Sequence, residues 1–242
     1  MSDRHCVAVR ELATLRINVG CGRTPTLGWL NFDNSFTVRL ARFPSCLRVL
    51  YYLKLASEES LISAPVIIQQ NIAWADATKR LPLTDKSVAI VYSSHMLEHL
   101  DREGALQFLA EAQRVLVNNG IIRLAVPDLR RRILQYLEHG DGDRFIGSLT
   151  MRSHNLRTIQ DKIKMLLVGD RDHRWMYDAK SLSRLLNLNG FSNAAEVPPG
   201  VTHIEEPGEL NLRDREDESI YVEARKGASQ TSVMGTSGTL GA

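Results

Sequence analysis

Glycines and acidic residues follow apolar runs in the first third of the chain, where they could bind a ligand. Gly20 and Gly22 come directly after the run INV, with Cys21 between them. Asp33 closes the run WLNF, and Asp76 closes the run IAWA. Glycine lets a backbone approach a ligand closely, and a carboxylate accepts hydrogen bonds from hydroxyl and amino groups. This pattern indicates a site for a nucleotide-type ligand.

Residues that could take up a proton follow the later runs. Ser94 and His95 come after SVAIVYS, Asp128 comes after IIRLAVP, and His173 lies shortly before a helix expected from Asp178. Ligands of open α/β sheets bind beyond the carboxyl ends of the strands. A base that acts on such a ligand must therefore come from these positions.

The elements that position these residues are readable from apolar patterning. Strands are expected over residues 16–20, 29–33, 66–76, 87–94, 121–127 and 219–226. Helices are expected over residues 102–120, with Asn119-Gly120 as the stop, and over 178–191, with Asp178 as N-cap. The alternation predicts βαβ units, and the last two strands predict an antiparallel closing hairpin.

The organisation along the chain indicates one domain. We expect it to cover residues 1–226, with insertions at about 37–62 and 129–172. The tail, residues 227–242, is rich in Gly, Ser and Thr and has little to bury, so we expect it to be disordered.

Charge and cysteine content narrow the class of protein. The 30 basic residues are balanced by 28 acidic ones, which gives a net charge of +2 and no global field toward nucleic acid. The three cysteines lack metal-ligand spacing, and no run is long and apolar enough for a signal or membrane-spanning segment. We expect a cytoplasmic protein without a transmembrane segment.

The glycine turn argues against a dinucleotide cofactor. The fingerprint G-x-G-x-x-G requires a third glycine, and Pro25 stands in its place. A ligand with ribose and adenine but no pyrophosphate would still need a close glycine turn and two carboxylates. S-adenosylmethionine is such a ligand.

The chain resembles the class I S-adenosylmethionine-dependent methyltransferases, in particular the type 11 group. The resemblance covers roughly residues 15–226 and is carried by INVGCG, NFDNS, ADATKRLPLTDKSVAIVYSSHMLEHL, AQRVLVNNGIIRLAVPD, HRWMYDAKSLSRLLNLNGF and SIYVEARK. It implies a Rossmann-like, doubly wound, mostly parallel seven-stranded sheet with an antiparallel last strand and helices on both faces. The last two pieces look most like predicted methyltransferases of polysaccharide and glycolipid biosynthesis.

The resemblance implies roles for the residues around the glycine turn. Gly20 and Gly22 would lie against the methionine part of the cofactor, with Cys21 as a small turn residue. Asp33, followed by Asn34, would hold the ribose. The alternative for Asp33 is a strand-end residue that caps a neighbouring turn.

It also implies which residues face the adenine and the sulfonium. Asp76 with Ala77 would face the adenine, and Ser94 with His95 would approach the sulfonium. The alternative for Asp76 is a plain turn residue. For Glu98 and His99, just after the fourth strand, packing and helix capping stand beside chemistry.

A hydroxyl acceptor would need a base, because its pKa lies far above 7. In many type 11 enzymes an aromatic segment headed by His, similar to HRWMYD here, covers the pocket, so we rank His173 and His95 above Asp128. The alternative for His173 is a residue that only orders this lid. Metal dependence is left open, because some sugar O-methyltransferases use a divalent ion bound by carboxylates. No metal ligands are assigned, because the only candidate acids, Asp128, Asp170 and Asp172, are ordinary loop acids.

The resemblance makes residues 128–175 the region that varies with the substrate. Residues 130–132 are all arginine and form either a solvated face or a site for a phosphate or carboxylate. Trp175 and Tyr177 suit the face of a sugar ring. The expected acceptor is therefore a small molecule such as a saccharide or glycolipid precursor, and the alternative acceptor is another small metabolite methylated on N or O.

Two other hypotheses assign the chain a different class of function. A non-catalytic subunit could keep the fold to bind a partner protein. A nucleic-acid methyltransferase is disfavoured, because SSHM stands where NPPY or DPPY would be expected. The basic, aromatic insertion at 37–55 is a core-packing helix pair, a subunit contact of a homodimer, or a peripheral membrane contact.

Overall fold

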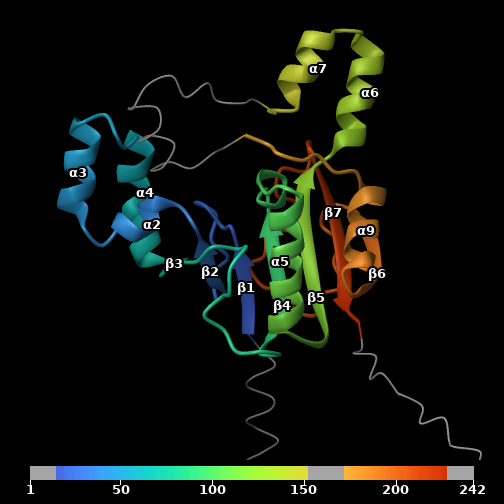
Figure 1. Ribbon diagram of the computed structural model, residues 1–242, viewed down its shortest axis with the longest axis horizontal. Coiled ribbons are helices and arrows are strands. Elements are labelled where there is room, and N and C mark those ends of the chain that lie inside the picture. The colour runs from blue at the N-terminus through green and yellow to red at the C-terminus, as the bar shows by residue number, and fades with distance from the viewer. Residues whose placement is uncertain (1–14, 152–171, 228–242) are drawn as a thin grey trace, which may run out of the picture.

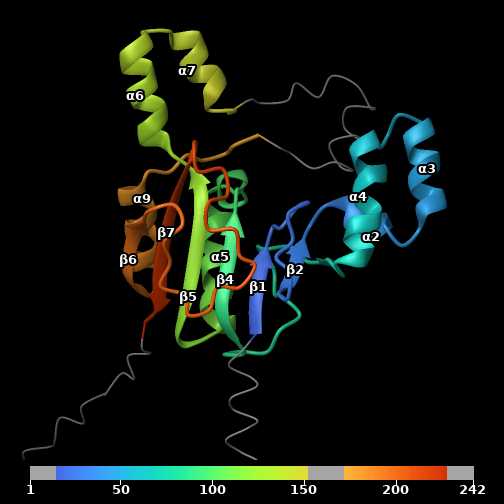
Figure 2. The same cartoon turned by 180° about the vertical axis from the view of Figure 1, so that it is seen from behind.

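The computed structural model describes residues 15–151 and 172–227, and its centre is a seven-stranded sheet (Figure 1). The strand order is β3-β2-β1-β4-β5-β7-β6. The strands are β1 Leu15–Val19, β2 Leu30–Asp33, β3 Ala73–Trp74, β4 Val88–Ser94, β5 Leu116–Pro127, β6 Phe191–Val197 and β7 Ser219–Lys226. β7 runs antiparallel to both of its neighbours, and the other pairings are parallel. The predicted Rossmann-like class, a mostly parallel seven-stranded sheet with an antiparallel last strand and flanking helices, is confirmed, but the described helices do not cover both faces of the sheet (Figure 1 and Figure 2).

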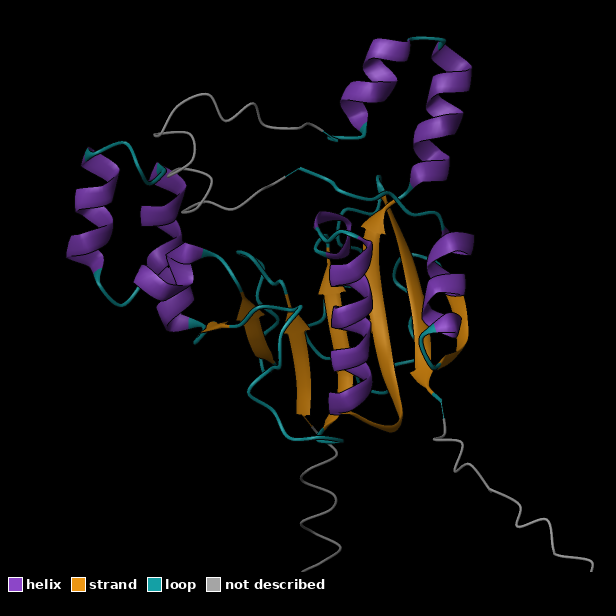
Figure 3. Cartoon of the chain, viewed as in Figure 1, coloured by secondary structure: helices purple, strands orange, loops and turns teal. Residues whose placement is uncertain are grey.

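Helices lie over one face of the sheet, beside its β3 edge and beyond the carboxyl end of β5 (Figure 1 and Figure 3). The described helices are α2 Phe36–Leu40, α3 Pro44–Tyr52, α4 Glu58–Gln69, the 3₁₀ helix η1 Leu97–His99, α5 Arg102–Val115, α6 Leu129–His139, α7 Gly142–Ser148 and α9 Ala179–Leu188. Side chains of α5 and α9, among them Phe108 and Leu182, share one buried cluster with Val91 of β4. This cluster is the main core.

The opposite face of the central strands is covered by the loop of residues 198–218 (Figure 2). Ile204 and Leu210 of this loop pack with Trp29, Tyr92 and Ile121 in a second buried cluster. The back layer here is thus a loop that leaves β6 and returns to β7.

Two predicted element boundaries are wrong. Val66–Gln69 belongs to α4 and not to the third strand, because the Ser57 side chain caps a helix that then runs through this apolar segment. Helix α5 ends at Val115, and Leu116 already pairs with Val88. Asn119, at φ 64°, and Gly120 lie in an irregular part of β5 instead of ending a helix.

No helix connects β1 to β2. Residues 20–29 form a compact turn held by buried amide side chains: Asn31 Oδ1 accepts from the Thr26 N–H at 2.8 Å, and Asn18 Nδ2 donates to Thr26 Oγ1 at 3.1 Å. This turn positions the two glycines at the end of the sheet. Side-chain hydrogen bonds hold the turn, where a packed helix would otherwise do so.

The helices in the two predicted insertions pack in two groups, α2–α4 and α6–α7. Helices α2, α3 and α4 share a cluster that contains Val38, Leu47 and Ile67, as the core-packing alternative predicts. Their outer surface exposes apolar side chains, including Tyr52, which is 81% exposed. Helices α6 and α7 stand beyond the carboxyl end of β5 (Figure 1). Residues 152–171 lie outside the described residues. The tail predicted to be disordered does too, except for its first residue, Gly227.

No helix in the described part of the chain has the length and apolar content needed to cross a bilayer.

A buried ion pair ties the loop of residues 198–218 to the sheet. Arg123 of β5 and Glu223 of β7 face each other in the antiparallel register, and Arg123 NH1 lies 2.6 Å from Glu223 Oε1. Arg123 is fully buried and also donates to the carbonyl of Val201 at 2.9 Å. Glu223 in turn accepts from Thr202 Oγ1 at 2.6 Å and from the His203 N–H at 2.8 Å.

Removing one partner of this pair should destabilise the protein. Arg123→Met leaves the Glu223 carboxylate buried without its main partner, which costs about 3–5 kcal/mol. Urea unfolding of the variant should show this loss, and Arg123→Met/Glu223→Leu should recover a large part of it. The control is Arg80→Met, whose partner Asp85 is exposed, and equal losses in both single variants would contradict the assignment.

The stability of the folded protein should also decrease as the pH falls, because the Glu223 carboxylate then becomes protonated. Burial acts to raise the pKa of Glu223, but hydrogen bonds from Thr202, His203 and Arg123 lower it below its usual value. The ionised form is therefore favoured by folding, so its contribution is complete above the pKa of the unfolded chain, about 4.3, and is lost as pH falls below it. Unfolding measured between pH 3 and 7 should show a smaller decline in Glu223→Gln.

Candidate functional site

A cleft of about 1100 Å³ lies at the carboxyl ends of β1, β2 and β4. Helices α2 and α4 line one side of it, and the segment after β4 lines the other together with residues 173 and 174. Among the predicted site residues, the cleft brings together Gly20, Gly22, Asp33, Asn34, Asp76, Ala77, His95 and His173.

The glycine turn and Asp33 form one unit at the floor of the cleft. Gly20 and Gly22 have φ values of 74° and 52°, which glycine adopts without strain. The Asp33 Oδ2 accepts from the Gly22 N–H at 2.9 Å, and Oδ1 accepts from the Ser35 N–H at 2.8 Å. Asp33 therefore does cap neighbouring turns, while each carboxylate oxygen keeps a lone pair for a ligand.

The two glycines have different neighbours. A Cβ on Gly20 would collide with the Met96 side chain, whereas a Cβ on Gly22 would meet no atom within 4 Å. Gly20 is thus required for packing against Met96. Gly22 borders open space in the cleft, where its missing side chain leaves room for a ligand.

Asp76 lies farther along the same wall. Its Oδ1 accepts from the Thr78 N–H at 2.9 Å and from Thr78 Oγ1 at 2.8 Å, so the turn interpretation of Asp76 holds for this oxygen. Trp74 stands next to it in the cleft, with the Arg39 guanidinium 3.7 Å from its ring centroid. An aromatic face beside a carboxylate suits a planar base with an amino group.

His95 is fixed at both ring nitrogens. Nε2 lies 2.8 Å from Ser219 Oγ, and Nδ1 lies 3.3 Å from Glu98 Oε1. Its backbone adopts the left-handed region at φ 49°, and its N–H donates to the carbonyl of Ala125 at 2.9 Å. Only 6% of the side chain is exposed, so His95 is a constrained group at the cleft wall.

His99 and His173 lie together in the cleft. Their ring centroids are 5.1 Å apart in an edge-to-face arrangement. His99 Nδ1 lies 3.1 Å from the carbonyl oxygen of Asp172, and His173 Nδ1 lies 2.8 Å from Thr150 Oγ1. Partial burial lowers the pKa of His173 below its usual value, although the negative charge of Glu98 opposes this shift. A neutral imidazole is therefore favoured at His173.

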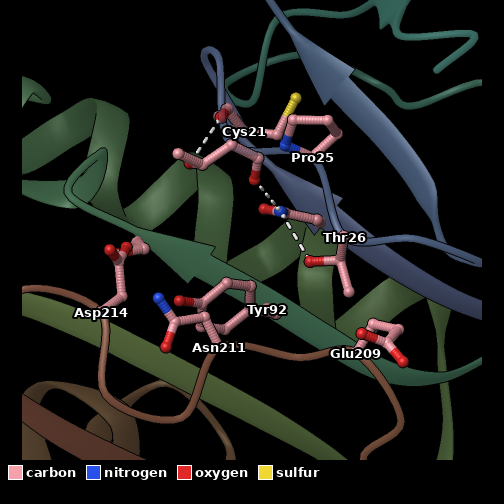
Figure 4. Close-up of a pocket in the computed structure, with 11 residues that line it drawn as sticks. Cys21, Pro25, Thr26, Tyr92, Glu209, Asn211 and Asp214 are labelled. Atoms are coloured by element: carbon pink, nitrogen blue, oxygen red, sulfur yellow. Dashed lines mark hydrogen bonds between the residues drawn. The ribbon is translucent and has the colours of Figure 1, made fainter. Parts of the chain in front are cut away.

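Two predicted cofactor residues line a different, smaller pocket. It measures about 90 Å³ and lies between the glycine turn, Tyr92 and the loop of residues 209–214 (Figure 4). Ser94 Oγ donates to Asp214 Oδ2 there at 2.7 Å. Cys21 borders the same pocket, and burial followed by the charge of Asp33 raises the pKa of its thiol, so it is no nucleophile.

Several residues of the substrate-variable region lie away from the cleft. The Asp128 carboxylate accepts from the Arg130 N–H at 2.9 Å and caps α6. Arg131 donates to the carbonyl of Glu216 at 3.1 Å, and Arg132 pairs with Glu218 at 3.0 Å. Tyr177 is buried in the main core. These residues hold structure, and none of them lines the cleft.

Some residues that line the cleft were not predicted from the sequence. Met96, Trp74 and Arg39 line the cleft, and the approach of Met96 to Gly20 depends on the path of the chain after β4. A tryptophan two residues before Asp76 was a usable signal, because an aromatic side chain next to a ligand carboxylate often stacks on the ligand.

Comparisons with known proteins bear on the class of this site. Residues 17–124 match the type 11 family model described as a methyltransferase domain. No curated protein matches the chain significantly. Among solved structures, the chain is similar to a SAM-dependent methyltransferase from Archaeoglobus fulgidus, with 14% identity, a TM-score of 0.48 and coverage of 92% of this chain and 91% of that one. It is also similar to the PH0226 protein from Pyrococcus horikoshii OT3, with 16% identity, a TM-score of 0.48 and coverage of 93% and 92%.

The matched segment contains the glycine turn, Asp33, Asp76 and His95. The match to a methyltransferase domain indicates S-adenosylmethionine as the cofactor, and the cleft fits it. Open space beside Gly22, the available lone pairs of Asp33, and Trp74 beside Asp76 are the donor set and the room that a nucleoside with a sulfonium side chain requires.

Loss of the Asp33 carboxylate should weaken cofactor binding. Hydrogen bonds to a charged group contribute about 1.5–3 kcal/mol each, so Asp33→Ala should raise the Kd for S-adenosylhomocysteine about tenfold or more in calorimetry. Asp33→Asn, which keeps one acceptor oxygen for the turn, should show part of the loss. Glu196→Gln, an exposed change on β6, is the control. An unchanged Kd in Asp33→Ala would rule out a role in binding the cofactor.

Proposed function

We propose that the protein transfers the methyl group of S-adenosylmethionine to a hydroxyl oxygen of a saccharide or related small molecule. One observation carries the proposal: a single cleft is lined by the glycine turn, by two carboxylates and by three histidines. The carboxylates are those of Asp33 and Asp76, and the histidines are His95, His99 and His173. The match of residues 17–124 to a methyltransferase domain supports it.

The chain's own residues have distinct tasks in this proposal. When bound, S-adenosylmethionine supplies a methyl carbon activated by a sulfonium. Asp33 holds the ribose hydroxyls, and Asp76 with Trp74 receives the adenine. The rigid wall at His95 and Met96 fixes the position of the reacting carbon, and alignment of this kind supplies much of the rate of a displacement.

His173 is the best placed group for the acceptor's proton. It is half-buried in the cleft and neutral at pH 7, so it offers a lone pair to a hydroxyl. His95 Nε2 is bonded to Ser219 Oγ and its Nδ1 lies near the Glu98 carboxylate, so we assign it a positioning role. Asp128 lies outside the cleft lining and ranks last.

The surroundings of His173 support a saccharide acceptor. Trp175 is 41% exposed two residues beyond His173, and the Arg102 guanidinium lies 4.8 Å from its ring centroid. Arg174 lines the cleft beside them. An aromatic ring stacks on the C–H face of a sugar, while the arginines bond to hydroxyl or acidic substituents. Screening acceptor pools with labelled cofactor, followed by mass spectrometry, tests this part.

His173→Ala should lower turnover by about a hundredfold or more, because the group that takes up the proton is lost. The Kd for S-adenosylhomocysteine should stay nearly constant, since His173 lies at the acceptor end of the cleft. His139→Ala, an exposed change at the end of α6, is the control.

A reduction of only a few-fold in His173→Ala would contradict the role of His173. Binding of S-adenosylhomocysteine without transfer to any acceptor pool would instead favour the non-catalytic subunit. A chain that binds neither form of the cofactor would overturn the proposal as a whole.

A further inference from the structure

Three side chains at the acceptor end of the cleft have the composition of a metal site. Glu98, His99 and His173 each place one ligand atom within 4.8 Å of the other two. Ligand atoms about 2.1 Å from an ion lie at most about 4.2 Å apart, so modest side-chain rotations would close the set around a cation. Two imidazoles and one carboxylate are the donors that first-row divalent cations accept.

The Glu98 carboxylate is buried without hydrogen bonds from the described part of the chain that would offset its loss of contact with water. The residue is fully buried, and neither carboxylate oxygen has a hydrogen-bond partner among the described residues. His95 Nδ1 lies 3.3 Å from Glu98 Oε1, and the other nitrogen of that ring lies 2.8 Å from Ser219 Oγ. Burying a carboxylate costs free energy unless a cation or hydrogen-bond donors satisfy it. A cation bound next to Glu98 would offset this cost.

The two histidines are oriented by their other contacts. His99 Nδ1 lies against the carbonyl of Asp172, which fixes the tautomer with a proton on Nδ1 and leaves a lone pair on Nε2. Thr150 Oγ1 lies 2.8 Å from His173 Nδ1 and 3.3 Å from its Nε2. An oxygen partner at one nitrogen, as at His99, is the usual support of a metal-ligating histidine.

The backbone also holds the three residues together. The Glu98 carbonyl accepts from the N–H groups of Arg174 at 2.7 Å and Trp175 at 3.1 Å. These bonds bring the segment around His173 onto η1. The cluster is therefore built into the fold, although its members are far apart in the sequence.

We propose that Glu98, His99 and His173 bind a first-row divalent cation, such as Mn²⁺ or Zn²⁺, that in turn binds the acceptor hydroxyl. Three protein ligands leave coordination positions open toward the cleft. The inference rests on the proposed function and refines it: His173 gives its lone pair to the cation, and the cation replaces His173 as the group that activates the hydroxyl.

The chemistry balances without an additional reactant. A cation-bound hydroxyl has a lowered pKa and releases its proton to solvent. The oxygen then forms a bond to the methyl carbon as the bond from sulfur to that carbon breaks, and its electron pair stays on sulfur. The products are the methyl ether, S-adenosylhomocysteine and one proton.

Direct cation binding by the untagged full chain tests the site. After treatment with EDTA and removal of the chelator, calorimetry with Mn²⁺ or Zn²⁺ should show one site, and the Mn²⁺ electron spin resonance signal should change on binding. Glu98→Gln and His99→Ala should each weaken binding at least tenfold, while His139→Ala should bind as the wild type does. Two ligand variants are used so that one that fails to fold leaves the other.

The outcomes separate this inference from the proposed function. S-adenosylhomocysteine binding should persist in His99→Ala, and added Mn²⁺ or Zn²⁺ should restore methyl transfer lost in EDTA. Absence of cation binding by the wild type, or equal affinity in both ligand variants, would overturn the cation site and leave His173 as the base. Cation binding without cofactor binding would overturn the proposed function and leave the cation site.

Discussion

The buried pair of Arg123 and Glu223 is the interaction on which the central architecture depends. It sits where the parallel part of the sheet meets its antiparallel strand, and both partners also bond to the loop of residues 198–218. A lone charge in this position would be costly, so loop and strands must form together. That loop covers Tyr92 and borders the small pocket behind the glycine turn. The pair thus fixes the back of the structure against which the cleft is built.

The glycine turn shows how a structural role of one residue can be compatible with a proposed role in binding. Asp33 bonds to backbone groups on both sides of the site, at Gly22 and at Ser35. Because no helix follows β1, these bonds and the amides of Asn18 and Asn31 hold the turn. The capping interpretation and the ribose interpretation of Asp33 are therefore compatible, since a carboxylate has more lone pairs than its two backbone donors use.

The sequence predicted the features that depend on local pattern. Apolar runs before glycine or acidic residues located β1 and β2, the apolar run before Ser94 and His95 located β4, and the Asp178 cap located α9. It failed at Val66–Gln69, because a short apolar run fits a helix or a strand equally well and the capping Ser57 decides the matter upstream. It also could not tell that Ser94 turns toward Asp214 and away from the main cleft, because that depends on the path of a distant loop.

The group of Glu98, His99 and His173 is the part of the site that local sequence pattern could not predict. Glu98 and His99 are adjacent in sequence, but His173 joins them only through the backbone bonds of residues 174 and 175 to the Glu98 carbonyl. Sequence spacing pointed to loop acids such as Asp172 and could not show that His173 lies beside Glu98 and His99. Asp172 contributes instead through its carbonyl, which orients His99. A buried carboxylate flanked by two oriented imidazoles at the acceptor end follows from the fold, because that fold places the segment before α9 over the end of β4.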